Sequence, residues 1–250
     1  MRLFLITIFC VYCSTSIFAQ YCPPLSGKIG EKKSFHITAG YGFTKMYGDI
    51  SNNSALGSAG TIQVDYQLKK GLYVGVESQF GKLKTEVSSN ADARQSINDY
   101  TAAGVVATIH PFELLAKRRS HLQTATDVFL NSFFVGVGTL YVINNYDQVY
   151  RNFNDLSSYG PIEGYDENDD PIFHTRTRSL VLPSLNFGIN VPLIYGYSND
   201  YMLSLVLKGQ VNYAQNDVVD AYTPYDSQGV RIQGESDVYN FYSLGIRYSF

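Results

Sequence analysis

The stretch that decides the fold is GTIQVDYQLKKGLYVGVESQFG, residues 60–81. Apolar and polar side chains alternate on both sides of its centre, which is typical of a β-strand with two different faces. The apolar positions are Ile62, Val64, Tyr66, Leu68, Leu72, Val74, Val76 and Phe80. Between the two runs, Lys-Lys-Gly at residues 69–71 predicts a tight turn. The stretch therefore predicts a β-hairpin with strands at residues 60–68 and 72–81.

The same period of two continues through the rest of the chain and predicts eight strands. These strands are residues 34–43, 60–68, 72–81, 99–109, 132–143, 180–191, 201–213 and 238–250. Most have the length that a tilted strand needs to cross a bilayer. Pro183 is expected near the outer end of its strand, where a missing donor is tolerable. The prediction is all-β: an eight-stranded antiparallel up-and-down transmembrane β-barrel, or ten strands if residues 144–178 contain a further hairpin.

The connections alternate in length along the chain. The long ones are residues 44–59, 82–98, 144–179 and 214–237, and the short ones are residues 69–71 and 192–200. Short periplasmic turns and long outer loops are typical of outer-membrane barrels. Residues 110–131 depart from this pattern, because this connection is long and should face the periplasm. Its centre, residues 112–122, predicts a short basic amphipathic helix.

The N-terminus has the features of a secretory signal peptide. Arg2 precedes an apolar run at residues 3–11, and the small residue Ala19 stands just before Gln20. We expect cleavage after Ala19. The predicted parts are a signal peptide at 1–19, an N-terminal periplasmic segment at 20–33 and an outer-membrane barrel domain at 34–250. Cys22 would then be the one cysteine of the mature chain, which leaves no internal disulfide.

The composition excludes some classes of protein. Charged residues make up 16% of the chain and the net charge is −3, so no basic patch suggests a nucleic-acid partner. After the N-terminus no run reaches the 18 or so apolar residues of a membrane helix. Tyr (21), Phe (15) and Gly (21) are abundant, which favours a β protein. No sequence feature indicates a cofactor.

Alternation alone does not distinguish a membrane barrel from a soluble barrel with an apolar interior. The polar faces are rich in Gly, Ser, Thr, Asn and Gln, which suits the narrow interior of an eight-stranded barrel. Tyrosines also recur near the strand ends, where an aromatic girdle is expected. They are Tyr41, Tyr66, Tyr73, Tyr100, Tyr141, Tyr201, Tyr213, Tyr242 and Tyr248. Both features favour the membrane.

The C-terminal strand adds a third feature. Alternate positions up to the C-terminal residue hold apolar or aromatic side chains, namely Tyr242, Leu244, Ile246, Tyr248 and Phe250. An ending in aromatic-x-Phe resembles the terminal signature of bacterial outer-membrane proteins, which the barrel-assembly machinery reads. Residues 239–250, YNFYSLGIRYSF, resemble the last strand of the small outer-membrane β-barrel family that includes OmpA- and OmpX-like barrels, particularly its Bacteroidetes members. The resemblance implies a fold, the outer membrane of a Gram-negative bacterium with its lipid, and an assembly route, but no activity.

Four charged side chains fall on the polar strand faces, and a barrel would point them inward. Asp65 and Glu77 lie on the second and third strands, and Lys208 and Arg247 on the seventh and eighth. Burying such charges singly is costly, so they are expected to pair. Their depths along the strands predict the ion pairs Asp65–Arg247 and Glu77–Lys208. A lumen filled in this way argues against a general diffusion porin.

No catalytic site is assigned from the sequence. Hydrolysis by a serine nucleophile needs a histidine within hydrogen-bond reach, and the four histidines are His36, His110, His121 and His174. None of them forms a recognisable motif with Ser or Glu. His174 with Asp170 is the one candidate pair, and a solvated loop is the interpretation that the sequence favours for it. The protein is therefore expected not to be an enzyme.

Residues 166–170 form an acidic run that resembles part of a calcium-binding loop. Asp166, Asn168 and Asp170 are spaced as at the start of an EF-hand loop. However, Pro171 stands where that loop needs Gly, and Thr177 where it needs Glu. A solvated acidic run is the interpretation that the sequence favours, so no metal site is predicted.

The expected role is structural, or one of surface interaction through the outer loops. Residues 144–178 are the expected contact surface for an extracellular ligand. One alternative is an outer-membrane lipid-modifying enzyme, and another is a secreted soluble ligand-binding barrel. The terminal Phe250 and the absence of Trp disfavour the soluble barrel.

Overall fold

The structure is a computed structural model, and its described residues begin at Ser34. They are residues 34–47, 54–85, 94–115, 125–152, 155–168, 170–195, 201–223, 225–226, 230, 232 and 236–250. The predicted signal peptide, its cleavage site and residues 20–33 lie outside them, as does His121.

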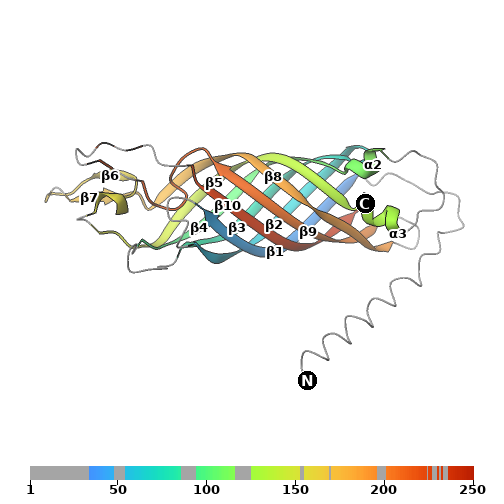
Figure 1. The fold of residues 1–250 in the computed structure, drawn as a ribbon, viewed down its shortest axis with the longest axis horizontal. Coiled ribbons are helices and arrows are strands. Elements are labelled where there is room, and N and C mark those ends of the chain that lie inside the picture. Colours follow the sequence, from blue (N-terminus) through green and yellow to red (C-terminus); the bar gives the residue numbers. More distant parts are fainter. Residues whose placement is uncertain are drawn as a thin grey trace, which may run out of the picture. The chain divides into compact units, whose positions relative to one another are not determined.

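Eight antiparallel strands form a closed barrel, which confirms the predicted fold class (Figure 1). The strands are β1 (Phe35–Tyr47), β2 (Ser54–Lys69), β3 (Leu72–Thr85), β4 (Ser96–Ile109), β5 (Phe133–Val149), β8 (Arg176–Tyr195), β9 (Met202–Ala214) and β10 (Val238–Ser249). Their order around the barrel is β1-β10-β9-β8-β5-β4-β3-β2. The first and last strands close it, since the amide of Phe35 donates to the carbonyl of Phe250 at 3.1 Å and receives the reciprocal bond at 3.0 Å.

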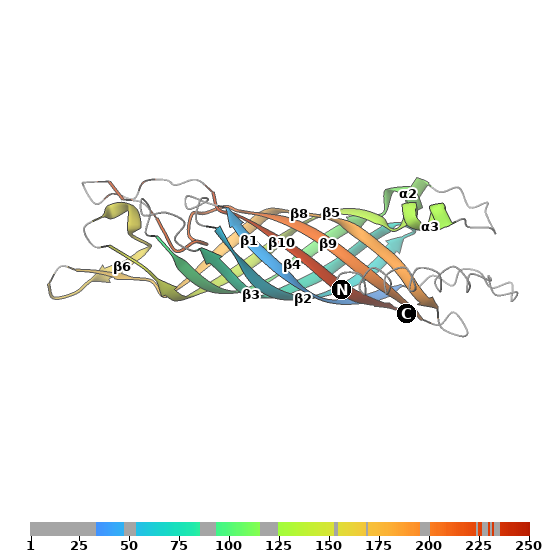
Figure 2. The same cartoon turned by 60° about the horizontal axis from the view of Figure 1, so that its bottom comes forward.

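A further hairpin lies in the connection between β5 and β8. It consists of β6 (Ile162–Tyr165) and β7 (Pro171–Phe173), preceded by the 3-10 helix η3 (Leu156–Ser158). The hairpin forms a separate two-stranded sheet, and both views place it beyond the ends of the barrel strands (Figures 1 and 2). The alternative of ten barrel strands is therefore wrong. We call this end of the barrel the loop end.

The opposite end carries two short helices, α2 (Pro111–Leu115) and α3 (Ala125–Asn131), and the C-terminus (Figure 1). We call it the helix end. A helix over 112–122 was predicted, but α2 ends at Leu115 and 116–124 lie outside the described residues. Pro111 suits the first position of α2, where its missing N–H would bond nothing anyway. No helix in the described ranges is long and apolar enough to span a membrane.

Several strands are longer than predicted, so parts of the expected loops 44–59, 82–98, 144–179 and 192–200 are strand. The prediction ended strands where the apolar alternation ended, whereas the backbone ladder continues through polar residues. Lys82 and Asp99, for example, face each other across β3 and β4, and Lys82 Nζ lies 2.9 Å from Asp99 Oδ1.

Pro183 lies within β8 rather than near its end. It falls at a register shift between Val181 and Ser184 in the pairing with β9. A bulge leaves backbone groups outside the ladder, so the missing N–H of proline is tolerated there.

The two faces of the wall differ in the opposite sense from a soluble protein. Apolar side chains point outward and remain exposed, such as Val76 (56%), Leu207 (53%) and Ile246 (58%). Charged and amide side chains such as Asp65, Glu77 and Gln79 point inward and are buried. Of the nine predicted girdle tyrosines, seven are exposed on the outside. Tyr73 and Tyr100 are instead buried, because each shares the strand parity of the inward-facing residues.

Candidate functional site

The barrel interior holds two buried ion pairs. Lys208 Nζ on β9 lies 2.5 Å from Glu77 Oε1 on β3. Arg247 Nη2 on β10 lies 2.9 Å from Asp65 Oδ2 on β2. The structure thus brings together all four charged residues that the sequence singled out, in the same pairs. The Glu77–Lys208 pair joins β3 and β9 across the lumen, whereas the Asp65–Arg247 pair joins β2 and β10, the two neighbours of β1.

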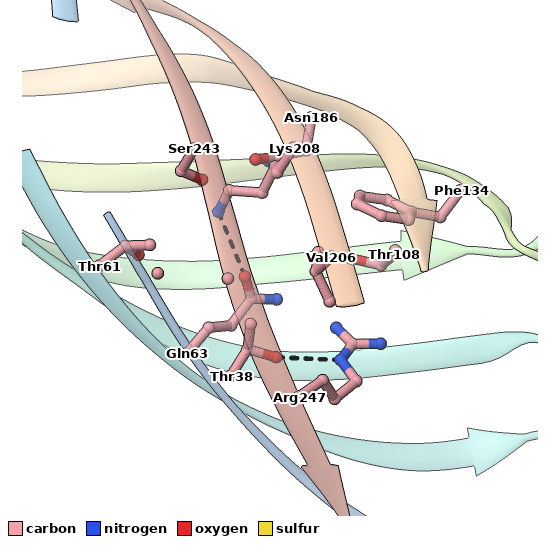
Figure 3. A pocket seen from close by; sticks show the side chains of 12 residues that line it. Thr38, Thr61, Gln63, Thr108, Phe134, Asn186, Val206, Lys208, Ser243 and Arg247 are labelled. Carbon is pink, nitrogen blue, oxygen red and sulfur yellow. Dashed lines mark hydrogen bonds between the residues drawn. The ribbon is translucent and has the colours of Figure 1, made fainter. Parts of the chain in front are cut away.

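Gln63 links the two ion pairs into one network. Its Nε2 donates to Asp65 Oδ1 at 2.8 Å, and its Oε1 accepts from Lys208 Nζ at 3.3 Å. Figure 3 shows the Lys208–Gln63 bond beside that of Arg247, whose Nε donates to Thr38 Oγ1 at 2.9 Å. Gln63 is not among the site residues predicted from the sequence. It points inward like Asp65, two residues further along β2, and it pairs with Glu77 across β2 and β3, so the same alternation could have identified it.

Amide and hydroxyl groups extend this network toward the loop end. Gln79 Nε2 donates to Gln210 Oε1 at 2.5 Å, and Gln210 Nε2 donates to Ser184 Oγ at 2.8 Å. Ser184 Oγ in turn donates to Asn212 Oδ1 at 2.7 Å. A pocket beside the ion pairs is lined by Thr38, Gln63, Lys208, Ser243 and Arg247, among others (Figure 3). Hydrogen-bonded side chains therefore cross the middle of the lumen.

An apolar layer also fills part of the interior. It includes buried side chains from all eight barrel strands and from the loop after β9, among them Met46, Leu83, Val142, Val219 and Phe241. The polar inner face predicted from the sequence does not include this layer. The signal was present, because Met46, Leu83 and Val142 stand at inward parity near the loop ends of their strands.

The loop after β9 folds into the barrel mouth instead of standing outside it. Residues 217–223, which we call the mouth segment, are buried. Asn98 Nδ2 on β4 donates to the carbonyl of Val219 at 2.7 Å, and Ser96 Oγ donates to the carbonyl of Asp220 at 2.8 Å. Tyr222 OH donates to the carbonyl of Tyr150 at 2.7 Å. The expected outer loop 214–237 is thus in part a closure of the mouth.

Aromatic rings lie inside the helix end. The ring of Tyr73 lies 5.1 Å from that of His36 and 5.0 Å from that of His110, which itself lies 5.7 Å from Phe134. His110 Nδ1 lies 3.1 Å from the carbonyl of Asn131. Burial lowers the pKa of His110 to about 4, so its ring is neutral at neutral pH.

A serine and a histidine meet here, although no sequence motif joined them. His36 Nδ1 lies 2.7 Å from Ser249 Oγ, and both residues are buried in the barrel. A nucleophile needs access to its substrate. Since Ser249 is 0% exposed, the pair serves the packing of the helix end and does not form a site open to substrate.

The acidic run of the large loop forms the turn between β6 and β7. Asp166 Oδ1 accepts the backbone N–H of Asn168 at 2.8 Å and that of Asp170 at 2.9 Å. These bonds lower the pKa of Asp166. His174 does not pair with Asp170 as the sequence suggested, because its Nδ1 lies 3.8 Å from Glu163 Oε2.

No protein-family model matches the sequence, and no curated protein matches it. Solved structures resemble the fold distantly. Neisserial surface protein A is 13% identical, and the match covers 86% of this chain and 97% of that one with a TM-score of 0.43. Ail of Yersinia pestis, in complex with the heparin analogue sucrose octasulfate, is 9% identical, and the match covers 88% of this chain and 100% of that one with a TM-score of 0.39. OprG from Pseudomonas aeruginosa is 10% identical, and the match covers 87% of this chain and 97% of that one with a TM-score of 0.37.

Proposed function

We propose that this chain is a small, closed β-barrel of a bacterial outer membrane, with a structural or surface-interaction role through its loop end. The carrying observation is the inverted wall, which has an apolar outer face and buried charged pairs inside. Soluble monomers rarely expose contiguous apolar patches of more than a few hundred Å². A lipid environment removes that cost, because it covers the outer face with hydrocarbon.

The alternative of a soluble ligand-binding barrel does not fit this arrangement. Such a barrel needs an apolar cavity inside and a polar surface outside. Here the interior is filled by the ion pairs, the apolar layer and the mouth segment. The same filling supports a closed barrel over a diffusion pore.

The terminal residues support assembly by the usual outer-membrane route. The residues proposed as the assembly signal form one exposed stripe along β10 and its end, namely Tyr242, Leu244, Ile246, Tyr248 and Phe250. The ring of Phe250 stacks on that of Phe35 with centroids 6.0 Å apart, at the seam between the first and last strands. An assembly machinery that binds this stripe would hold the strand that closes the barrel.

The first test is heat modifiability. Outer membranes are isolated, and the protein is run in SDS with and without boiling. We expect it in the membrane fraction, with a band that shifts on boiling because the closed hydrogen-bonded wall resists SDS until it is heated. Recovery in the soluble fraction with no shift would contradict the proposal.

The loop end is proposed to face the cell exterior, with residues 144–178 as the contact surface. The guanidinium of Arg151 packs over the ring of Phe173 in β7, 4.2 Å from its centroid. Its tip exposes Tyr165 (61%) and Ile172 (48%). An ordered hairpin with exposed aromatic and aliphatic side chains suits an extracellular ligand.

Cysteine labelling tests this orientation. Tyr165→Cys and Leu115→Cys are made separately in a Cys22→Ser background, since both positions are highly exposed but lie at opposite ends of the barrel. A membrane-impermeant maleimide on intact cells is expected to label Tyr165→Cys alone. Leu115→Cys should react only after the outer membrane is permeabilised. The reverse pattern would place the helix end outside.

A further inference from the structure

Three aspartates meet at the barrel mouth, apart from the ion pairs of the lumen. Asp217 and Asp220 belong to the mouth segment, and Asp237 immediately precedes β10. All three are buried, and one carboxylate oxygen from each lies within 4.8 Å of the others. Like charges this close repel strongly where water is excluded, so the cluster requires a source of positive charge or bound protons.

Asp237 has one buried carboxylate oxygen that no described donor reaches. Its Oδ2 accepts the backbone N–H of Val219 at 2.7 Å and that of Asp220 at 3.3 Å. Its Oδ1 is buried and has no hydrogen-bond partner among the described residues. The pKa of Asp237 is raised well above its usual value by burial, and further by the charges of Asp220 and Asp217. This buried oxygen of Asp237 is thus available to a bound cation.

Arg151 is a described cation whose charge acts on the cluster. The charge of Asp220 raises the pKa of Arg151, although burial outweighs this and lowers it overall. The guanidinium is stacked over the rings of Phe173 and Tyr222, at 4.2 Å and 5.8 Å from their centroids.

We propose that Asp217, Asp220 and Asp237 bind a divalent cation, and that the ion is Ca²⁺. Calcium takes six to eight oxygen ligands at about 2.3–2.6 Å, so two of its ligand oxygens lie up to about 5 Å apart. The observed spacing within 4.8 Å fits this geometry. Zinc prefers nitrogen and sulfur ligands, and magnesium retains several waters, which a buried cluster does not accommodate.

The ion has a structural consequence at this place. Asp237 stands at the beginning of β10, whereas Asp217 and Asp220 belong to the mouth segment. A cation held by all three joins the mouth segment to the barrel wall. Calcium thereby fastens the closure of the mouth, and its removal loosens residues 217–223 while the barrel remains closed.

Terbium provides a direct probe of the site, because Tb³⁺ replaces Ca²⁺ at oxygen sites and emits when a nearby tyrosine is excited. The chain has 21 Tyr and no Trp, so the sensitisation comes from tyrosine. The full-length barrel is refolded in detergent, treated with a chelator and titrated with Tb³⁺. We expect one saturable site per chain, from which Ca²⁺ displaces the terbium. No saturable signal in the folded protein would overturn the proposal.

Variants assign the site. Asp237→Asn and Asp220→Asn are each expected to weaken Ca²⁺ binding by at least about tenfold, because each removes a charged ligand. Asp147→Asn is the matched control, since its carboxylate is exposed at the same end of the barrel and outside the cluster. Heat modifiability shows that each variant is folded. Equal affinity in Asp237→Asn and Asp147→Asn contradicts the proposal.

A measurement on the parent protein covers the case in which a variant fails to fold. Limited proteolysis is run with Ca²⁺ and with a chelator, and the fragments are identified by mass. The expected result is that cleavage within residues 215–237 is slowed by calcium and accelerated by the chelator. Cleavage that is the same in both conditions shows that the carboxylates are neutralised by protons or by side chains, and overturns the proposal.

Discussion

Replacing Lys208 with Met destabilises the barrel by about 3–5 kcal/mol, because Glu77 then remains buried without its counter-charge. In the structure Glu77 is 2% exposed, and Lys208 Nζ lies 2.5 Å from its Oε1. The loss is measured by urea unfolding of the barrel in lipid vesicles. The samples are run in SDS without boiling, and the intensity of the folded band relative to the unfolded band gives the folded fraction.

Two controls separate this effect from a general cost of losing lysine. Lys82→Met removes an exposed pair with Asp99 and is expected to change stability little, because water screens exposed ion pairs. The double variant Glu77→Gln/Lys208→Met removes both charges and is expected to recover much of the loss, since no unpaired charge remains. If Lys208→Met costs no more than Lys82→Met, the buried pair does not hold the wall together.

Val76→Arg is the strongest test of the membrane assignment. Val76 faces outward between Val64 and Val105 of the neighbouring strands, and all three are exposed apolar residues. In a bilayer, arginine at such a position costs about 2–4 kcal/mol at the midplane. In water, the same change at an exposed site costs within about 0.5 kcal/mol.

The matched control is Tyr165→Arg at the tip of the β6–β7 hairpin, which lies outside the barrel wall and is expected to be nearly neutral. Both variants are unfolded by urea in vesicles. A Val76→Arg protein as stable as Tyr165→Arg would show that the outer face of the wall does not contact hydrocarbon.

The sequence predicted the barrel well where side chains alternate strictly. Strand parity is enough to place Asp65, Glu77, Lys208 and Arg247 inside, and their depth along the strands is enough to pair them, because an eight-stranded lumen is narrow. Tyr73 and Tyr100 illustrate the limit. They were expected in an outer girdle for their residue type, but their parity places both inside.

Features that depend on contacts between distant segments were not predictable. Residues 214–237 contain Asn, Asp, Ser and Gly and suggest a solvated loop, yet hydrogen bonds from Ser96 and Asn98 on β4 hold residues 217–223 in the mouth. The three aspartates therefore looked like scattered surface charges. Strand ends were also placed too early, since the ladder between polar residues such as Lys82 and Asp99 leaves no mark in the hydrophobic pattern.

The pairing of β1 with β10 is the contact that closes the barrel. The two strands pair over nearly their whole lengths, so the wall stays open until β10 reaches β1. Until that moment β1 and β10 are open edges with unpaired backbone groups and apolar outer faces, which is the combination that drives aggregation. Closure is also a contact of the longest sequence separation, which is slow to form. The unclosed chain must therefore be kept from pairing with other chains until these two edges meet.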